Sequence, residues 1–418
     1  LTFDNTFARL PEHFYSRLTP TPFVSPSHLI SFNPQVAELI GLHPDEAGRN
    51  ELLDYLSGKQ PWPGSDPLAM LYAGHQFGHY VPQLGDGRAI LLGEVRHQGA
   101  ETWDLQLKGC GMTPYSRQGD GRAVLRSTIR EYLCSEAMHA LGIPTTRALC
   151  IIGSDEEVYR EQIETGAMLL RVARSHVRFG SFEVFYYREQ PEHIKTLADY
   201  VIAHHYPELA ESQDKYVAWL REIVVRTAKL IAQWQSVGFA HGVMNTDNMS
   251  ILGLTLDYGP FGFLDRFDPG FICNHSDHHG RYAFDQQPHI GLWNLTCLAQ
   301  ALTPLMPVDA AKACLQEYEP AFINTYYDLM RDKLGLRETN EQSVELVNEL
   351  LDLMQTDARD YTNTLRILST FRTGKDAGNS HLRNHFISRV SFDQWARKYS
   401  RALVQENSDD RERAAHMN

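Results

Sequence analysis

The decisive stretch of this chain reads His241-Gly242-Val243-Met244-Asn245-Thr246-Asp247-Asn248, and Asp257-Tyr258-Gly259 follows it closely. Asn248 and Asp257 offer an amide oxygen and a carboxylate, which are the hard oxygen ligands that Mg²⁺ prefers. Val243, by contrast, has an aliphatic side chain that can neither accept nor donate a proton. The stretch therefore predicts a fold that brings a metal-binding amide and carboxylate together.

Protein kinases carry a motif of the same spacing, H-R-D-x-x-x-x-N followed by D-F-G. In that motif the first Asp accepts the substrate proton, and the Asn and second Asp hold magnesium. Here His241, Asn248 and Asp257 keep the spacing, but Val243 stands at the position of the catalytic base. The joint pattern predicts binding of Mg-nucleotide without ordinary kinase chemistry. Asp247 is the nearest carboxylate able to replace the base, although read alone it is typical of a loop-capping residue.

Composition narrows the class of protein. The chain has 418 residues, room for one large bilobal domain or two to three ordinary ones. A hydrophobic content of 43% with 22% charged residues is typical of a globular protein, and the net charge of -13 argues against a nucleic-acid partner. No stretch of about 18 apolar residues appears, so we expect no membrane span.

The cysteines and the first residues bear on the compartment. Six scattered cysteines form no C-x-x-C pair, which favours reduced thiols over a disulfide scaffold or a zinc site. Leu1-Thr2-Phe3-Asp4-Asn5 shows no charged-then-apolar leader. The cluster from His275 to His279 matches no closed zinc pattern and favours a polar loop. The scattered cysteines and the first residues together lead us to expect a cytoplasmic protein.

The order of expected elements predicts an α+β, protein-kinase-like bilobal fold with N- and C-terminal extensions. Residues 1–65, rich in Pro and aromatics, are expected to form an extension with short helices packed on the core. Residues 66–180 are expected to form a strand-rich N-lobe, and residues 181–418 a helical C-lobe that carries the catalytic and metal-binding loops.

Individual elements follow from periodicity. Two strands are expected at 89–95 and 103–108, joined by a turn at 98–100, with Leu105 and Leu107 facing one way and Gln106 and Lys108 the other. A helix is expected over 124–141, and its apolar face is expected to carry Leu125, Ile129, Tyr132 and Leu133. Further strands are expected at about 146–153 and 167–173, and helices at about 214–237, 289–304, 308–332, 343–355 and 391–404. The charge run from Ser408 is expected to be a solvated helix end.

Basic and glycine-rich residues complete the predicted site. Lys108 ends a strand and Glu131 lies mid-helix, the arrangement in which a kinase Lys grips phosphates and a Glu steers it, although alone the pair is typical of a protein surface. The tetrapeptide G-D-G-R occurs twice, at 85–88 and 119–122, where glycine amides can form anion-binding nests. Arg171 and Arg178 are candidate forks for phosphate.

Long motifs resemble the selenoprotein O family, called YdiU in bacteria. They include Gly74-His75-Gln76-Phe77-Gly78, Gln83-Leu84-Gly85-Asp86-Gly87-Arg88, Leu107-Lys108-Gly109, Thr113-Pro114-Tyr115-Ser116-Arg117 and Gly119-Asp120-Gly121-Arg122-Ala123-Val124-Leu125-Arg126-Ser127. They continue with Phe239-Ala240-His241-Gly242-Val243-Met244-Asn245-Thr246-Asp247-Asn248-Met249-Ser250 and Leu256-Asp257-Tyr258-Gly259-Pro260-Phe261-Gly262-Phe263. The likeness spans nearly the whole chain.

The resemblance implies a pseudokinase that binds ATP in a flipped orientation and transfers AMP to hydroxyl side chains of proteins. By the matching motifs, Lys108 and Glu131 would form the ion pair, Asp247 would accept the proton, and Asn248 and Asp257 would hold Mg²⁺ or Mn²⁺. The nucleotide would be lined by Gly85, Gly87, Arg88, Asp120, Gly121, Arg171 and Arg178. The resemblance also implies a bacterial cytoplasmic protein, which we expect to be a monomer.

The sequence leaves three other functions open. They are UMP transfer from UTP with Mn²⁺, an atypical kinase that uses Asp247 as its base, and a scaffold that binds nucleotide without catalysis. Family members usually continue with a segment that carries a Cys or selenocysteine. The last cysteine here is Cys314, so this sequence contains no counterpart of that residue. The target proteins are not apparent from the sequence.

Overall fold

The computed structural model describes residues 1–97, 99, 101–374 and 379–417. This described part divides into two compact units by its internal contacts. Unit 1 comprises Leu1–Arg226, Asn245–Gly259 and Trp293–Leu315, and unit 2 comprises Thr227–Met244, Pro260–Leu292 and Gln316–Asn418. The segment from Asn245 to Gly259 therefore belongs to unit 1, although unit 2 flanks it on both sides in the sequence.

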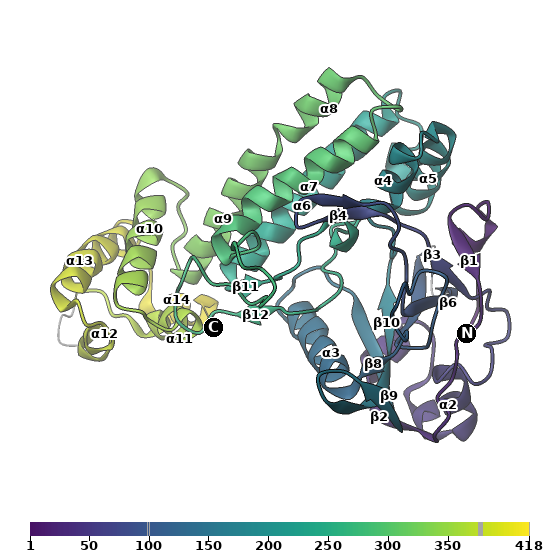
Figure 1. Cartoon of the computed structure of the whole chain (residues 1–418). Helices are drawn as coiled ribbons and strands as arrows, with labels where there is room; N and C mark the ends of the chain where they lie inside the picture. The colour runs from purple at the N-terminus through teal and green to yellow at the C-terminus, as the bar shows by residue number, and fades with distance from the viewer. Residues whose placement is uncertain (98, 100, 375–378, 418) are drawn as a thin grey trace. The chain divides into compact units, whose positions relative to one another are not determined.

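Unit 1 is built on one antiparallel sheet, in the strand order β1-β3-β6-β7-β10-β9-β2, with β8 added beside β10 (Figure 1). The strands of this sheet are β1 (Tyr15–Arg17), β2 (Ser27–Phe32), β3 (Leu68–Met70), β6 (Ala89–Arg96), β7 (Thr102–Lys108), β8 (Ala123–Val124), β9 (Arg147–Tyr159) and β10 (Ile163–Ala173). A separate hairpin pairs β4 (Gly74–Gln76) with β5 (His79–Val81). The N-terminal segment thus adds a strand to each edge of the sheet, besides its expected short helices.

The two faces of the sheet follow from the alternation of its strands. Leu105 and Leu107 of β7 pack in a buried cluster with residues of the short helices α1 (Pro34–Leu39) and α2 (Asn50–Leu56). Gln106 and Lys108 point to the opposite face, as the sequence predicted, because side chains alternate along a strand. The predicted turn at 98–100 includes residues 98 and 100, which lie outside the described residues.

Helix α3 (Leu125–Ala140) covers that opposite face, but the predicted apolar face of this helix was wrong (Figure 1). Ile129 and Leu133 are exposed, and Leu125 and Tyr132 are only partly buried. The buried residues are instead Thr128, Glu131, Cys134, Ser135 and Met138. Polar side chains share the inner face with Cys134 and Met138, and Glu131 there binds cations that project from the sheet, so ion pairing as well as apolar burial orients the helix.

Beyond residue 180 the chain is mainly helical, as expected. The helices are α4 (Gly180–Tyr187), α5 (Pro191–His205), α6 (Lys215–Ser236), α7 (Gln287–Ala301), α8 (Val308–Leu315), α9 (Tyr318–Lys333), α10 (Glu341–Thr356), α11 (Tyr361–Ile367), α12 (Ser380–His385), α13 (Arg389–Gln405) and α14 (Asp410–Met417). The single helix predicted over 308–332 is two helices. Pro320 explains the break, because its ring would clash with the Gln316 carbonyl in a continuous helix.

Unit 2 has its own apolar core, formed by residues of α9 to α13 and the loops between them together with Ala240, Leu264, Phe267 and Phe284. A short pair of strands, β11 (Phe239–Ala240) and β12 (Gly262–Phe263), also belongs to this unit. The charge run at the C-terminal end forms α14, but Arg413 within it is buried and not solvated as predicted. Its guanidinium donates to the Phe371 carbonyl and to Asp410, which satisfies the buried charge.

Among the helices that the structure describes, none is both long and apolar enough to cross a membrane.

Candidate functional site

The site is built around an ion pair between the sheet and α3. Lys108, the last residue of β7, donates to Glu131 in the middle of α3, and both side chains are almost fully buried. Burial lowers the pKa of Lys108 to about 8, and the neighbouring Arg171 acts in the same direction against the attraction of Glu131. Removing one partner of such a pair would leave a buried charge uncompensated. The sequence prediction that these two residues meet is thus confirmed.

Arg171 on β10 links this pair to Asp257, which follows the central motif, His241–Asn248. Its Nε lies 2.6 Å from Glu131 Oε1, and its Nη2 lies 2.6 Å from Asp257 Oδ1. A third bond, 3.0 Å long, runs from Nη1 to the side-chain oxygen of Gln106. Arg171 is buried, so its guanidinium fixes the positions of these acceptors in a water-poor environment.

Arg178 completes the network from the other side of Asp257. Its Nη1 donates to Asp257 Oδ2 and, over 2.6 Å, to the main-chain carbonyl of Asp247. The guanidinium carbon lies 4.8 Å from the centre of the Tyr72 ring, within cation–π range. Arg178 and then Arg171 hold the pKa of Asp257 well below its usual range despite burial, so this carboxylate is ionised.

Main-chain bonds hold the segment Asn245–Gly259 against the loop between β10 and α4. The Phe179 amide donates to the Met249 carbonyl over 2.9 Å, and the Ile251 amide donates to the Val177 carbonyl over 3.1 Å. Asn248 lies in a short 3₁₀ helix, Thr246–Asn248, that directly precedes the first of these bonded residues. The backbone therefore fixes the segment next to Arg178 before any ligand binds.

Asp247 is buried and only half satisfied. Its Oδ2 accepts a hydrogen bond from the side-chain amide of Gln76 over 3.2 Å. Its Oδ1 is buried and makes no hydrogen bond to the described residues. Burial raises the pKa of Asp247 to about 6, and the hydrogen bond from Gln76 opposes that rise. A carboxylate that has a raised pKa, and one oxygen without a hydrogen-bond donor, is suited to accept a proton near neutral pH.

Asn248 and Asp257 meet the chemical requirements of a hard divalent cation. Asp257 supplies an ionised carboxylate and Asn248 an amide oxygen, within the same unit. Both Asp257 oxygens accept bonds from Arg171 and Arg178, so these arginines compete with a cation for the carboxylate. The residues fit a Mg²⁺ or Mn²⁺ ion if the arginines turn to phosphate oxygens when nucleotide binds.

The first glycine-rich segment lies beside Lys108. Gly85 has a φ of 87°, and Gly87 accepts a bond from the Ser116 hydroxyl through its carbonyl. Arg88 immediately precedes the strand pairing of Ala89 with Lys108, and its charge contributes to the lowered pKa of that lysine. The exposed Arg88 side chain makes no hydrogen bond or ion pair with the described residues, which leaves its guanidinium available to an anion.

In the second glycine-rich segment, Gly121 supports the backbone, whereas Asp120 is exposed. Gly121 has a φ of 70°, and its carbonyl oxygen accepts a hydrogen bond from the Gly111 amide over 3.1 Å. Asp120 is exposed and forms a two-bond ion pair with Arg160. The structure thus brings together Lys108, Glu131, Arg171, Arg178, Asp247 and Asp257, and leaves Asp120 outside this hydrogen-bonded network.

Sequence reasoning missed three residues that organise the network. Asp86, inside the first G-D-G-R, is buried and accepts from Gln106 over 3.3 Å as well as from the Met70 amide. Gln106 then bonds to Arg171, and Gln76 bonds to Asp247. The alternation of β7 could have indicated Gln106, since it shares the face of Lys108. No local signal marks Gln76.

The first four residues of the central motif, His241–Met244, lie in unit 2. His241 is buried and stacks on Trp234 with ring centroids 5.3 Å apart, and its Nδ1 accepts from the Val243 amide over 3.4 Å. Its main-chain amide donates to the Gln287 side chain over 2.8 Å. His241 therefore braces the loop through both its side chain and its main chain.

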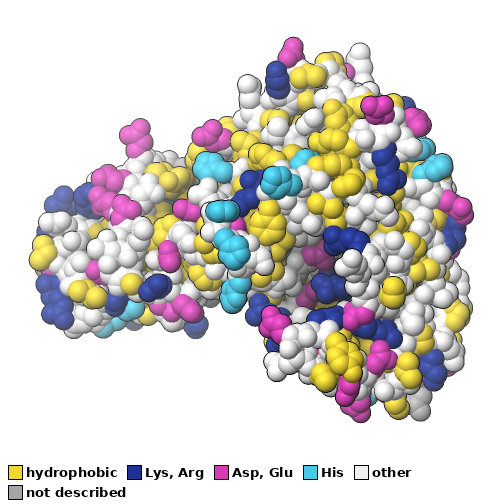
Figure 2. Space-filling model, in the orientation of Figure 1, with side chains coloured by type: hydrophobic (Ala, Val, Ile, Leu, Met, Phe, Trp, Pro, Cys, Tyr) yellow, Lys and Arg dark blue, Asp and Glu magenta, His cyan; other side chains and the backbone are white. Residues whose placement is uncertain are grey.

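Figure 2 shows Lys and Arg side chains gathered in a hollowed region over the α3 and β10 part of the face in view.

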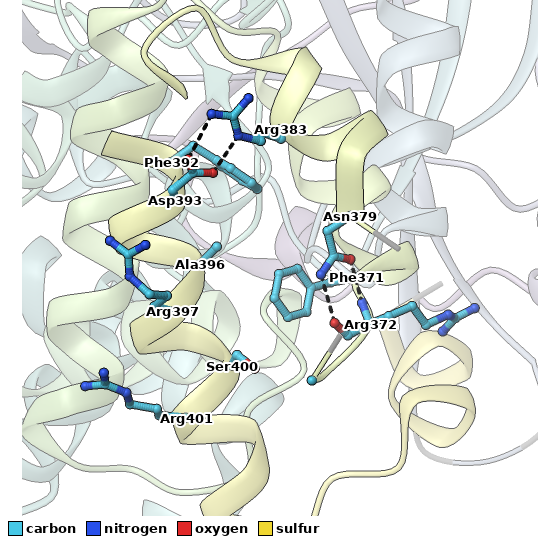
Figure 3. A pocket seen from close by; sticks show the side chains of 11 residues that line it. Phe371, Arg372, Asn379, Arg383, Phe392, Asp393, Ala396, Arg397, Ser400 and Arg401 are labelled. Carbon is cyan, nitrogen blue, oxygen red and sulfur yellow. Dashed lines mark hydrogen bonds and ion pairs between the residues drawn. The ribbon is translucent and has the colours of Figure 1, made fainter. Parts of the chain in front are cut away.

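A basic cavity of about 390 Å³ lies within unit 2 and is lined by Arg372, Arg383, Arg397 and Arg401 (Figure 3). Arg383 is held on Asp393 by two bonds of 2.8 and 3.0 Å. An amide and a carboxylate also line this cavity, but Asn379 bonds to the main chain of Arg372 and Asp393 bonds to Arg383. No residue of the motif His241–Asn248 is among the described lining residues, so the network of unit 1 is the candidate active site.

Comparison with known proteins agrees with this choice. The family model described as protein adenylyltransferase SelO matches residues 1–418. A protein nucleotidyltransferase YdiU of Thiobacillus denitrificans is 60% identical over 100% of this chain and 85% of its own length. Proteins of the same name from Myxococcus xanthus and Yersinia pseudotuberculosis are 59% and 53% identical, over 100% and 99% of this chain and 85% of their own lengths. This chain belongs to the family of the protein adenylyltransferase SelO.

Proposed function

We propose that this chain is a protein nucleotidyltransferase that transfers AMP from ATP to hydroxyl side chains of target proteins and releases pyrophosphate. Family membership supports this activity, and the relatives are named for nucleotidyl transfer. The observation that carries it is the half-satisfied Asp247 carboxylate beside a buried cluster of cations. A hydroxyl donor placed against Asp247 Oδ1 would satisfy that oxygen and position the hydroxyl for attack.

Each residue of the site has its own role in this reaction. Asp247 accepts the proton of a Ser, Thr or Tyr hydroxyl, whose oxygen forms a bond to the α-phosphorus as the bond to pyrophosphate breaks. Lys108, Arg171 and Arg178 hold the phosphates of the leaving group and balance its growing negative charge. Glu131 keeps Lys108 and Arg171 in position. A Mg²⁺ or Mn²⁺ ion, when bound by Asn248 and Asp257, would neutralise phosphate charge.

The fold of the chain and the orientation of the bound nucleotide are proposed on the same residues. We propose a kinase-like bilobal fold with boundaries near residues 65 and 180, and a flipped nucleotide lined by Gly85, Gly87, Arg88, Asp120 and Gly121 besides the two arginines. This fold is supported by the strand Lys, the helix Glu, the Asn that ends the central motif and the Asp that follows it. The flipped orientation is supported by the basic groups around Asp257, because they exceed what a kinase needs for its terminal phosphates.

Labelled nucleotides test the activity. Incubation with protein substrate and ATP labelled at the α-phosphorus is expected to label protein, whereas ATP labelled at the γ-phosphorus is not. Label from the γ position alone would show a kinase, and label from neither would show a scaffold. Parallel reactions with α-labelled UTP, with Mg²⁺ or Mn²⁺, distinguish AMP transfer from UMP transfer.

A further inference from the structure

Three potential metal ligands from distant parts of unit 1 converge next to the candidate site. They are His75 on β4, Glu183 on α4 and Cys297 on α7. Their ligand atoms all lie within 4.8 Å of one another. His75 Nδ1 already lies 2.8 Å from Glu183 Oε1. Because more than 100 residues separate each from the next, the tertiary structure alone brings them together.

The ligand set selects a class of metal. One imidazole nitrogen, one carboxylate oxygen and one thiolate sulfur form a mixed set that suits Zn²⁺ and is unlike the all-oxygen set of Asn248 and Asp257. Two tetrahedral ligands about 2.1 Å from a metal lie about 3.4 Å apart. His75 and Glu183 would separate slightly and Cys297 would move inward by no more than about 1.5 Å, a change within the reach of side-chain rotation.

Burial and charge favour a cation at this position. The Glu183 side chain is 0% exposed and that of His75 is 11% exposed. Among the described residues no Lys or Arg forms an ion pair with Glu183, and its second oxygen accepts from the neutral Thr246 hydroxyl. A buried carboxylate without a strong cationic partner is costly, and a metal ion would compensate it. The rings of Tyr80, Tyr187 and Trp293 lie around His75, with centroids 5.3 to 5.8 Å away, and limit access of water.

The cluster is coupled to the catalytic segment through one residue. Thr246 donates its hydroxyl to Glu183 and accepts, at 2.7 Å, from the His75 main-chain amide. Thr246 directly precedes Asp247 in the same 3₁₀ helix. Hydrogen-bond partners of metal ligands fix ligand orientation, and in return the bound metal would fix Thr246.

We propose that His75, Glu183 and Cys297 form a Zn²⁺ site that braces the catalytic segment through Thr246. Binding replaces the thiol proton of Cys297 with the metal and releases that proton to solvent, with no change in redox state. Three protein ligands leave one position for water or an external ligand. The metal site stands on its own geometry, whereas its effect on catalysis rests on the proposed function.

Cobalt titration tests the site directly. The whole protein is stripped of metal with a chelator, returned to buffer with excess Mg²⁺ to saturate sites made of oxygen ligands, and titrated with Co²⁺. We expect one equivalent to produce a thiolate-to-Co²⁺ charge-transfer band, and Zn²⁺ to abolish it by displacement. Cys297→Ser should remove the band, while Cys134→Ser, at a buried thiol on α3, should keep it. Circular dichroism establishes that each variant is folded.

Further variants separate this site from the catalytic one. Asp257→Asn should keep the Co²⁺ band even if it loses all transferase activity. Thr246→Val should weaken Co²⁺ binding by roughly 10- to 100-fold, as expected for a partner of a ligand. In hydrogen exchange, Zn²⁺ should slow the amides of residues 245–248 in the wild type but not in Cys297→Ser. A wild-type protein that gives no thiolate band, or a band that survives in Cys297→Ser, would overturn the proposal.

Discussion

The guanidinium of Arg178 lies on the carboxylate of Asp257, the residue expected to bind the catalytic metal. Arg171 occupies the other oxygen of the same carboxylate at 2.6 Å. A cation approaching without nucleotide therefore meets two positive charges around its carboxylate ligand. The phosphates of a nucleotide would draw the arginines away and add ligands of their own.

Metal binding should consequently depend on nucleotide. We expect Mn²⁺ to bind weakly to the protein alone and much more tightly with an ATP analogue that resists cleavage at the α-phosphorus. Arg171→Gln should raise the affinity for Mn²⁺ without nucleotide by about tenfold, because one unit of charge is removed beside Asp257. Electron paramagnetic resonance of unbound Mn²⁺ measures this. Arg160→Gln, at an exposed ion pair, is the control, and equal Mn²⁺ affinity in wild type and Arg171→Gln would contradict the competition.

Removing the proton acceptor should separate binding from chemistry. Asp247→Asn keeps the shape of the side chain but cannot accept the hydroxyl proton, so kcat should fall by about 10²- to 10⁴-fold. The Kd for ATP, measured by calorimetry, should change only a few-fold. Asp155→Asn, at an exposed carboxylate on β9, should leave both unchanged. Turnover close to wild type in Asp247→Asn would exclude Asp247 as the base.

The pH profile should reflect two shifted groups. The pKa of Asp247 is raised to about 6, so the carboxylate becomes able to accept a proton as the pH rises through that value, and activity should rise with it. The pKa of Lys108 is lowered to about 8, so its charge is lost above that value and activity should fall. A plot of kcat/KM against pH should therefore be bell-shaped, since it reports groups of the unbound enzyme. A profile without the acidic limb would argue against Asp247.

Gly121 should be sensitive to any side chain. A Cβ at this position would lie 2.0 Å from the Gly111 carbonyl oxygen, in a backbone with a φ of 70°. Gly121→Ala should cost about 1–2 kcal/mol of backbone strain and about 1–3 kcal/mol more through the clash. Gly142→Ala is the matched control, because its φ is 74° but nothing lies within 4 Å of the added carbon. Thermal unfolding should show a clearly larger drop in the midpoint for Gly121→Ala than for Gly142→Ala.

Local patterns of the sequence determined a large share of these features. The alternation along β7 placed Lys108 opposite Leu107, and the structure bears this out. That signal is reliable because the alternation of a strand depends on neighbours in the sequence. The spacing of the motif from His241 to Asn248 likewise led to the proposal that Asn248 and Asp257 bind metal. The boundaries of α6 were also close to those expected, since its apolar face repeats with helical period.

Only the tertiary structure decided which further groups meet. The sequence predicted the pair of Lys108 and Glu131, but it did not indicate that Glu131 also binds Arg171 from a second strand, an interaction that no pattern within the helix reveals. The same holds for His75, Glu183 and Cys297, whose convergence depends on packing between elements far apart in the chain. Periodicity reports local conformation, but a buried charge is stabilised by its partner in space, and the folded chain alone supplies that partner.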